Sequence, residues 1–191
     1  MSRIISGVAG SIRLAGAAPG TRPTSDRVKE SLFGALEADG AIENARVLDL
    51  FAGTLALGLE ALSRGAESLV AIEKHRPALE VCLKNASSVG TALNAAGRRP
   101  PMEIKLTDAF SYLAGTPKEF DLVLADPPYD LAPEKVAQLL SLIGHVISDD
   151  GVVVLEQAGT VVSLEIPNSR ELWSRREYGD TSVWMLKATA R

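Results

Sequence analysis

Four consecutive residues, Asp126-Pro127-Pro128-Tyr129, carry the clearest chemical signal in the sequence. The two prolines fix φ and lack backbone donors, so the chain stays extended with its carbonyl oxygens available as acceptors. The Asp126 carboxylate can accept a hydrogen bond from an NH2 group, and the Tyr129 ring offers a stacking face to a planar base. Acceptors that draw on the amine protons leave the nitrogen lone pair facing an electrophile. The segment predicts methylation of a base amine; the alternative is a strand-ending Pro-Pro turn with a packed tyrosine.

A second chemical signal lies in residues 47–58, which indicate a buried strand, a tight turn that contains Gly53, and the start of a helix. Backbone amides at such a helix start form a site for a charged small molecule. Glu73 ends the next strand, where a carboxylate commonly accepts hydrogen bonds from ribose hydroxyls, unless it simply faces solvent. Asp108 follows a third strand and is either a further polar group at this edge or the N-cap of a short helix. Together these positions predict a nucleotide-like cofactor.

The elements that must position these residues follow from the apolar pattern. From residue 46 onward, short runs of Val, Leu and Ile alternate with helical stretches, as in a parallel sheet covered on both faces. The predicted strands are 46–51, 68–73, 103–106, 120–125 and 151–157, and the predicted helices are 56–64, 77–88, 110–114 and 133–147. Residues 171–178 and 182–188 predict a closing antiparallel hairpin.

The segment that precedes this sheet has a different pattern. Residues 3–6 and 11–14 predict a small hairpin, and residues 24–36 have the spacing of a helix. We expect residues 1–36 to form an extension and residues 37–191 to form the domain that holds the site. Residues 1–35 also carry five basic side chains against two acidic ones, on a chain whose net charge is −4. An acidic chain does not fit nucleic-acid binding over its whole surface, so any such contact should concentrate here.

Composition limits the remaining possibilities. The 191 residues, 46% of them hydrophobic, predict one compact core. The single cysteine, Cys82, excludes an intramolecular disulfide, and no Cys or His cluster offers metal ligands. No apolar run is long enough to cross a membrane and no signal peptide is evident, so we expect a cytoplasmic protein without a metal. His75 and His145 are expected at the surface or at helix ends, away from the site.

The motif at residues 126–129 resembles the (Asp/Asn/Ser)-Pro-Pro-(Tyr/Phe/Trp) motif of amino-methyltransferases. Among these enzymes, the RsmD family, which methylates guanine N2 in small-subunit rRNA, is similar to residues 22–33 (RPTSDRVKESLF) and 57–66 (LGLEALSRGA). The likeness runs from residues 3–5 to the final hairpin. It implies an α/β, Rossmann-like class I S-adenosylmethionine-dependent methyltransferase fold: a seven-stranded, mostly parallel sheet with an antiparallel C-terminal hairpin, plus a small N-terminal β-hairpin.

The resemblance also implies a cofactor, a partner and roles for individual residues. The cofactor is S-adenosyl-L-methionine, and the partner is 16S rRNA within the small ribosomal subunit or an assembly intermediate, methylated by a monomer. The implied cofactor-binding residues are Asp49, Phe51, Gly53, Thr54, Gly58, Glu73, Lys74, Asp108 and Ala109. The implied catalytic residues are Asp126, Pro127, Pro128 and Tyr129. The implied RNA-contacting residues are Arg3, Arg13, Arg22, Thr24 and Arg27.

The sequence departs from the family pattern in two places. The family turn is usually Gly-Ser-Gly or Gly-Thr-Gly, but here Leu55 takes the place of its second glycine. If that position needs a positive φ, a leucine costs on the order of 1–2 kcal/mol, and its side chain is expected to intrude on the cofactor. Residues 7–14 are also poorer in Lys, Arg and Trp than the family's N-terminal hairpin, which predicts a weaker contribution to RNA binding.

Three functions remain open on the sequence alone. The first is an rRNA guanine-N2 methyltransferase, the second an amino-methyltransferase of DNA adenine or protein glutamine, and the third a non-catalytic RNA-binding assembly factor. Asp126 disfavours glutamine methylation, where asparagine is usual, and Leu55 favours the third function. The short extension leaves little room for the target-recognition region of a DNA enzyme, which favours a flipped-out base of structured RNA.

Overall fold

The computed structural model describes residues 2–16, 25–117, 119–159, 161, 163–166 and 170–188. The helices within these ranges are α1 (Asp26–Ala38), α2 (Ala56–Ser63), α3 (Arg76–Ala95), α4 (Ala109–Gly115) and α5 (Pro133–Ile143). The strands are β1 (Arg46–Leu50), β2 (Ser68–Glu73), β3 (Met102–Leu106), β4 (Phe120–Ala125), β5 (Ile147–Ala158), β6 (Arg170–Tyr178) and β7 (Thr181–Ala188).

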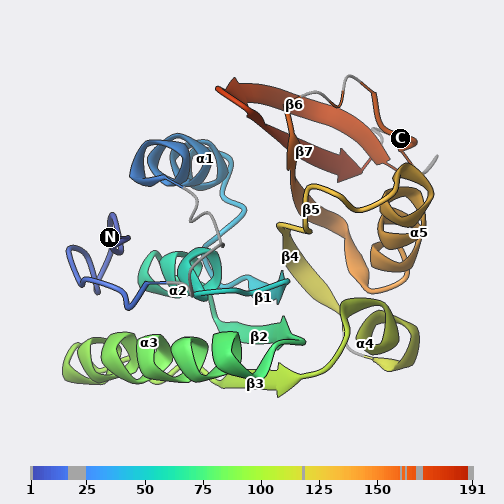
Figure 1. Ribbon diagram of the computed structural model, residues 1–191. Helices are drawn as coiled ribbons and strands as arrows, with labels where there is room; N and C mark the ends of the chain where they lie inside the picture. The colour runs from blue at the N-terminus through green and yellow to red at the C-terminus, as the bar shows by residue number, and fades with distance from the viewer. Residues whose placement is uncertain are drawn as a thin grey trace.

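The strands form one seven-stranded sheet in the order β3-β2-β1-β4-β5-β7-β6 (Figure 1). Neighbours from β3 to β5 pair in parallel, and β7 pairs antiparallel with both β5 and β6. The strand order reverses between β1 and β4, and the carboxyl ends of parallel strands at such a switch point form the usual ligand crevice. The sheet and its antiparallel C-terminal hairpin agree with the fold expected from the sequence.

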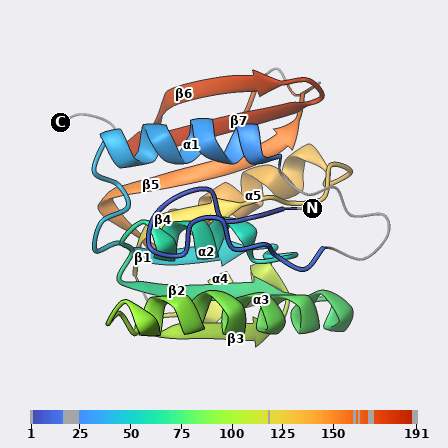
Figure 2. The ribbon, with the colours of Figure 1, turned by 90° about the vertical axis from the view of Figure 1, so that its left-hand side faces the viewer.

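The sheet is covered on both faces, which explains its continuous apolar strands. Helices α1, α2 and α3 lie on one face, and α4 and α5 lie on the other (Figures 1 and 2). Along β4, Leu122 and Leu124 belong to the core cluster under the first set of helices, whereas Val123 and Ala125 belong to the cluster under the second. Because successive side chains alternate between the faces, both are apolar until the strand ends. Asp126, the first polar side chain after β4, therefore marks the edge of the core at this strand.

Element boundaries differ from the prediction where tertiary pairing decides them. Helix α3 continues past the predicted end at residue 88 because Val89 and Leu93 keep the spacing of its buried face. Strand β5 begins at Ile147, where a helix was expected to end, because Ile147 pairs with Phe120 of β4. Helix α5 accordingly stops at Ile143.

Helix α1 covers β6 and β7, the last two strands in the sequence. The Tyr178 hydroxyl donates a hydrogen bond to Ser31 Oγ at 2.7 Å. Arg176 Nη1 donates to both the hydroxyl and the carbonyl oxygen of Ser31, at 2.7 and 3.0 Å. The face of β6 and β7 thus depends on a helix near the start of the chain, as Figure 2 shows.

The predicted N-terminal hairpin is wrong. Among the described residues, no strand forms in this segment: its two arms are joined by one isolated antiparallel bridge, between Arg3 and Arg13, and by backbone hydrogen bonds such as Ile4 N to Ile12 O at 2.9 Å. Beyond that bridge the chain turns to helix α2, since the amides of Ile5 and Ser6 donate to the Glu60 carboxylate at 2.7 and 3.1 Å.

The turn of the same segment is also fastened to α2. The Val8 amide donates to the Ser63 carbonyl at 2.9 Å, and the Ala9 amide donates to Ser63 Oγ. Gly7, at φ +80°, approaches so closely that a Cβ would lie 2.0 Å from the Ser63 carbonyl oxygen. The N-terminal segment is therefore a loop laid over α2 (Figure 2).

No helix in the described ranges is both long enough and apolar enough to pass through a lipid bilayer. The same ranges contain no group of three or more His, Cys, Asp or Glu side chains placed to hold a metal ion.

Candidate functional site

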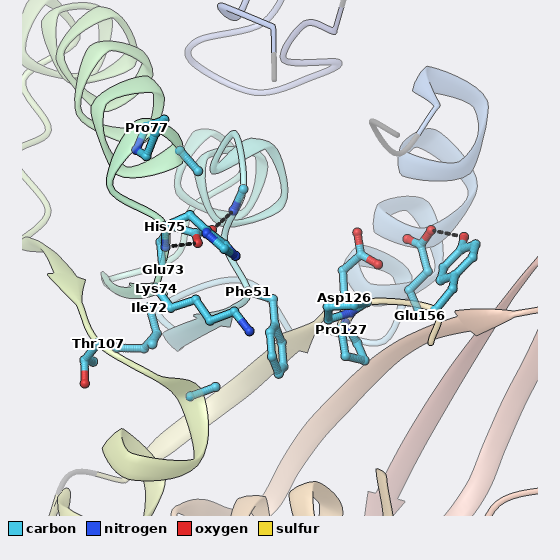
Figure 3. Close-up of a pocket in the computed structure, with 15 residues that line it drawn as sticks. Phe51, Ile72, Glu73, Lys74, His75, Pro77, Thr107, Asp126, Pro127 and Glu156 are labelled. Atoms are coloured by element: carbon cyan, nitrogen blue, oxygen red, sulfur yellow. Dashed lines mark hydrogen bonds between the residues drawn. The ribbon is translucent and has the colours of Figure 1, made fainter. Parts of the chain in front are cut away.

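The strand register gathers polar residues at the carboxyl edge of the sheet. Leu50 of β1 pairs with Ile72 of β2 and with Ala125 of β4, and Ala125 pairs with Leu155 of β5. One residue further along each strand, the chain places Glu73, Phe51, Asp126 and Glu156 in a row across this edge, and all four line one cavity of about 610 Å³ (Figure 3). Ligand pockets for small molecules commonly have volumes of roughly 300–1,000 Å³. The predicted site residues that line it are Phe51, Gly53, Glu73, Lys74, Ala109, Asp126, Pro127, Pro128 and Tyr129.

Glu73 is held rigidly at the β2 end of the cavity. Its Oε2 accepts from the Gly53 amide at 2.9 Å, and its Oε1 accepts from the His75 amide at 2.7 Å. The side chain is only 6% exposed, so these two bonds fix its orientation while it lines the cavity. A carboxylate has about four acceptor positions, so two backbone bonds leave capacity for hydroxyl donors. Binding of ribose hydroxyls by Glu73 stays a prediction of the sequence.

The turn after β1 has a left-handed backbone at three alternate positions. Phe51, Gly53 and Leu55 have φ of 61°, 56° and 64°. The expected cost of a positive φ at Leu55 therefore applies, at about 1–2 kcal/mol. The expectation that its side chain intrudes on the cofactor is wrong, because that side chain is fully buried in the core cluster with α1–α3 and does not line the cavity. Burying a leucine stabilises by about 1.5–3 kcal/mol, which offsets the backbone cost.

Three predicted cofactor residues lie behind the cavity wall instead of lining it. Asp49 Oδ2 accepts from the Gly58 amide at 2.9 Å, which caps the start of α2. Burial raises the pKa of Asp49 to about 7, partly offset by the Gly58 bond and raised further by Glu73 nearby. A Cβ on Gly58 would lie 2.7 Å from Leu69 Cδ1 and 2.9 Å from Asp49 Oδ2, so a larger residue would displace these side chains. The Thr54 carbonyl accepts from Asn85 Nδ2 at 2.8 Å, so Thr54 takes part through its backbone. These residues support the turn from behind.

Asp108 serves as the N-cap of α4. Its Oδ1 accepts from the amides of Phe110 and Ser111 at 3.0 and 3.1 Å. Its neighbours Thr107 and Ala109 line the cavity, whereas Asp108 does not. Of the two interpretations left open by the sequence, the capping role is the one that the hydrogen bonds show.

Asp126 and Tyr129 occupy the other end of the cavity, next to β5. Asp126 is partly buried, and its pKa is raised well above the ordinary value by burial, then by Glu156 and Asp49. The Tyr129 hydroxyl donates to Glu156 Oε1 at 3.3 Å and is hydrogen-bonded to Thr181 Oγ1, while 42% of the residue remains exposed. Burial, as the largest effect, raises the pKa of Tyr129, so its hydroxyl is neutral at physiological pH. The ring is thus anchored at its hydroxyl and open to stacking.

The predicted RNA-contacting residues do not lie in the cavity. Arg3 is exposed and pairs with Asp26 at 3.2 Å, and Arg13 and Arg27 are exposed. Arg22 and Thr24 lie outside the described residues.

Lys29, one of the five basic residues counted in the N-terminal segment, does not belong to that surface. Its side chain is fully buried, with Nζ 2.8 Å from Ser2 Oγ and 3.3 Å from Asp26 Oδ1. Burial, as the largest effect, lowers its pKa.

Sequence reasoning missed several residues of the cavity. His75, expected away from the site, lines it at its exposed mouth, and Glu156 lines it from β5. Glu156 lies inside the predicted strand 151–157, so only the register of β5 against β4 places it beside Asp126. Ile72, Pro77, Ala78 and Thr107 complete the lining with mostly apolar surface. The result is a cavity with carboxylates at both ends and apolar walls between them, which fits a cationic nucleoside.

Comparison with known proteins places the chain among methyltransferases. The family described as Conserved hypothetical protein 95 matches residues 2–187. A Bacillus subtilis protein named "Putative rRNA methyltransferase YlbH" is 33% identical over 169 residues, which are 87% of this chain and 88% of that protein. Ribosomal RNA small subunit methyltransferase D of Escherichia coli is 40% identical over 111 residues, 58% of this chain and 51% of that enzyme.

Solved structures share the fold of this chain. The structure described as "Putative methyltransferase yhhF from Escherichia coli" has a TM-score of 0.83 and 29% identity, and the match covers 100% of this chain and 99% of that one. The structure of SMU.776 complexed with SAH has a TM-score of 0.67 at 13% identity, with 84% of this chain and 50% of that chain covered, which shows the fold alone.

Proposed function

The chain belongs to the Conserved hypothetical protein 95 family and is an S-adenosyl-L-methionine-dependent methyltransferase, and from this premise we propose that it methylates the exocyclic N2 of a guanine in 16S rRNA of the small ribosomal subunit. The observation that carries the proposal is that Asp126, Tyr129 and Glu73 line the same cavity. An amine-binding loop and a ribose-binding carboxylate are thereby brought into one space.

The residues around the cavity fit the cofactor. Glu73 would hold the ribose hydroxyls, the Gly53 turn would lie against the amino-acid part, and Phe51, Ile72 and Ala109 would line the adenine. A Cβ on Gly53 would meet only the Phe51 carbonyl oxygen, at 3.8 Å, so this side of the turn is open. When bound, S-adenosyl-L-methionine supplies an electrophilic methyl group on a positively charged sulfur.

The Asp126 loop performs the remaining work on the base. The Asp126 carboxylate and the loop carbonyl oxygens accept hydrogen bonds from the amine, which directs its lone pair into the cavity. The nitrogen must lose one proton as the new N–C bond forms, and Asp126, whose pKa is raised by burial and by Glu156, is the base that receives it. Tyr129 stacks on the ring and fixes its plane.

Roles for the outer residues are part of the same proposal. Exposed Arg3, Arg13 and Arg27, with Arg22 and Thr24, would contact rRNA phosphates, so that residues 1–36 position the subunit and residues 37–191 carry out the chemistry. The enzyme would act as a monomer in the cytoplasm, where small subunits assemble. Because Leu55 packs into the core and leaves the cavity open, the feature that favoured a non-catalytic assembly factor no longer does so.

The test of this function uses small subunits from a strain that lacks the protein. Incubation with methyl-labelled cofactor is expected to label 16S rRNA, and mass spectrometry of the digested rRNA should identify N2-methylguanosine. Duplex DNA and protein substrates assayed in parallel should remain unlabelled. Equal labelling of DNA, or a methylated adenine or glutamine as the product, would contradict the proposal.

Cofactor affinity is expected to increase as the pH rises to about 7 and to level off above it. The pKa of Asp49 is raised to about 7, so the carboxyl group is protonated below that pH and charged above it. The charged form attracts the sulfonium, so binding favours ionisation of Asp49 and releases a proton. Calorimetric titrations across this pH range should show a steeper dependence for S-adenosyl-L-methionine than for S-adenosylhomocysteine, whose sulfur is neutral. Equal slopes for the two ligands would rule out the electrostatic explanation.

A further inference from the structure

Glu156 lies beside Asp126 and has no part in the chemistry described so far. The pairing of Ala125 with Leu155 places the next residues, Asp126 and Glu156, side by side on adjacent parallel strands. Both side chains point the same way into the cavity in Figure 3. Glu156 is 8% exposed, and the Tyr129 hydroxyl donates to its Oε1 at 3.3 Å. A hydrogen-bonded, nearly buried carboxylate thus adjoins the group that binds the amine.

The Watson–Crick edge of the target base decides what such a carboxylate would meet. In guanine, the N2 amine adjoins N1–H, so two neighbouring positions both donate. In adenine and cytosine, the amine adjoins a ring nitrogen that carries a lone pair and accepts. Guanine is therefore the one base of the three that presents a donor beside its amine, and two adjacent carboxylates match it.

We propose that Glu156 accepts the N1–H of the target base while Asp126 holds the amine, and that this pair selects guanine. The inference rests on the proposed function, since it assigns a second contact to the same base. A base with a lone pair at the corresponding ring position would face the Glu156 carboxylate with acceptor against acceptor. Sites built to hydrogen-bond a group reject analogues that lack it by large factors, because their buried polar groups are left unpaired.

The electrostatics of the cavity agree with this assignment. Burial and then Glu156 raise the pKa of Asp126, as expected for two carboxyl groups that lie side by side on adjacent strands. Two adjacent donors on one base edge would relieve that repulsion on binding, whereas a donor beside an acceptor would relieve only half of it.

The experiment compares guanosine with 2-aminopurine riboside, which keeps the amine but has no proton at N1. Each is placed at the methylated nucleotide of 16S rRNA and assembled into small subunits, and initial rates are measured with the wild-type enzyme and with Glu156→Gln. The wild type should prefer guanosine at least about a hundredfold. Glutamine can donate to the bare N1, so the preference should fall about tenfold or more in the variant. Affinity for S-adenosyl-L-methionine should stay within about twofold, which also shows that the variant is folded.

Thr181→Val is the matched control, because it removes the other hydrogen-bond partner of Tyr129 and leaves the Glu156 carboxylate in place. Its preference for guanosine should equal that of the wild type. An unchanged preference in Glu156→Gln, or an equal loss in both variants, would overturn the assignment of Glu156. A wild type that methylates neither substrate would instead refute the proposed function, so the two failures are distinguishable.

Discussion

Replacing Asp126 with alanine is expected to lower the turnover number about a thousandfold while the dissociation constant for S-adenosyl-L-methionine stays within about threefold. General acid–base groups contribute roughly 10²–10⁴ to rate, and Asp126 both orients the amine and receives its proton. Cofactor affinity is retained because Glu73 and the Gly53 turn lie at the opposite end of the cavity. Single-turnover assays on small subunits measure the first quantity, and calorimetry measures the second.

Asp130→Ala provides the matched control for this prediction. It removes the same group from an exposed residue next to the Asp126–Tyr129 loop that does not line the cavity. This variant should keep the wild-type turnover number. Full activity in Asp126→Ala would exclude the role assigned to Asp126, and equal losses in both variants would indicate damage to the loop instead of loss of chemistry.

Replacing Glu73 with glutamine is expected to weaken cofactor binding about a hundredfold. Both carboxylate oxygens accept from backbone amides, those of Gly53 and His75. Glutamine has one acceptor oxygen and one NH2 group, so one amide would face another donor, and leaving a buried donor unpaired costs about 1–3 kcal/mol. The ribose contact is weakened in addition, and a total of about 2.7 kcal/mol corresponds to a hundredfold change in affinity.

The control for Glu73→Gln is the same change at Glu80, which is exposed on α3. Calorimetric titration of Glu80→Gln should reproduce the wild-type dissociation constant. Thermal unfolding of both variants separates a loss of cofactor affinity at the site from a loss of stability of the whole fold. The unfolding midpoint of Glu73→Gln should be lower than that of the wild type. Wild-type cofactor affinity in Glu73→Gln would remove Glu73 from the cofactor site.

The features predictable from sequence were those whose signal is contiguous. The Asp126–Tyr129 loop combines its chemistry in four residues after an apolar strand, and the sheet follows from apolar runs that are buried on both faces. The position of Glu73 was predictable because it ends β2. Glu156 is a single acidic residue within the long strand β5, and only its pairing next to Asp126 reveals it as part of the cavity.

Contacts distant in sequence account for the failures. The N-terminal hairpin does not form because the side chains of Glu60 and Ser63 accept hydrogen bonds from backbone amides that lie 54 or 55 positions earlier in the sequence. No local sequence pattern indicates such a long-range contact. At Leu55 the sequence predicted a strained backbone but not the direction of the side chain, which depends on where the core lies. Asn85 joins the Thr54 carbonyl to Ala15. This contact was likewise not predictable, because Asn85 is a single polar residue within a helix.

The contact of α1 with the last hairpin has a consequence for synthesis of the chain. Ser31 meets Arg176 and Tyr178 across 145 and 147 positions of sequence. During translation, α1 leaves the ribosome long before β6 and β7 exist, so only α2 is available to it early, and the part of α1 that contacts these strands stays uncovered until they are made. Closing such a long loop is slow, and the exposed helix face is prone to aggregate while it waits. Nascent chains stalled before residue 170 should therefore need a chaperone, whereas chains that include β6 and β7 should not.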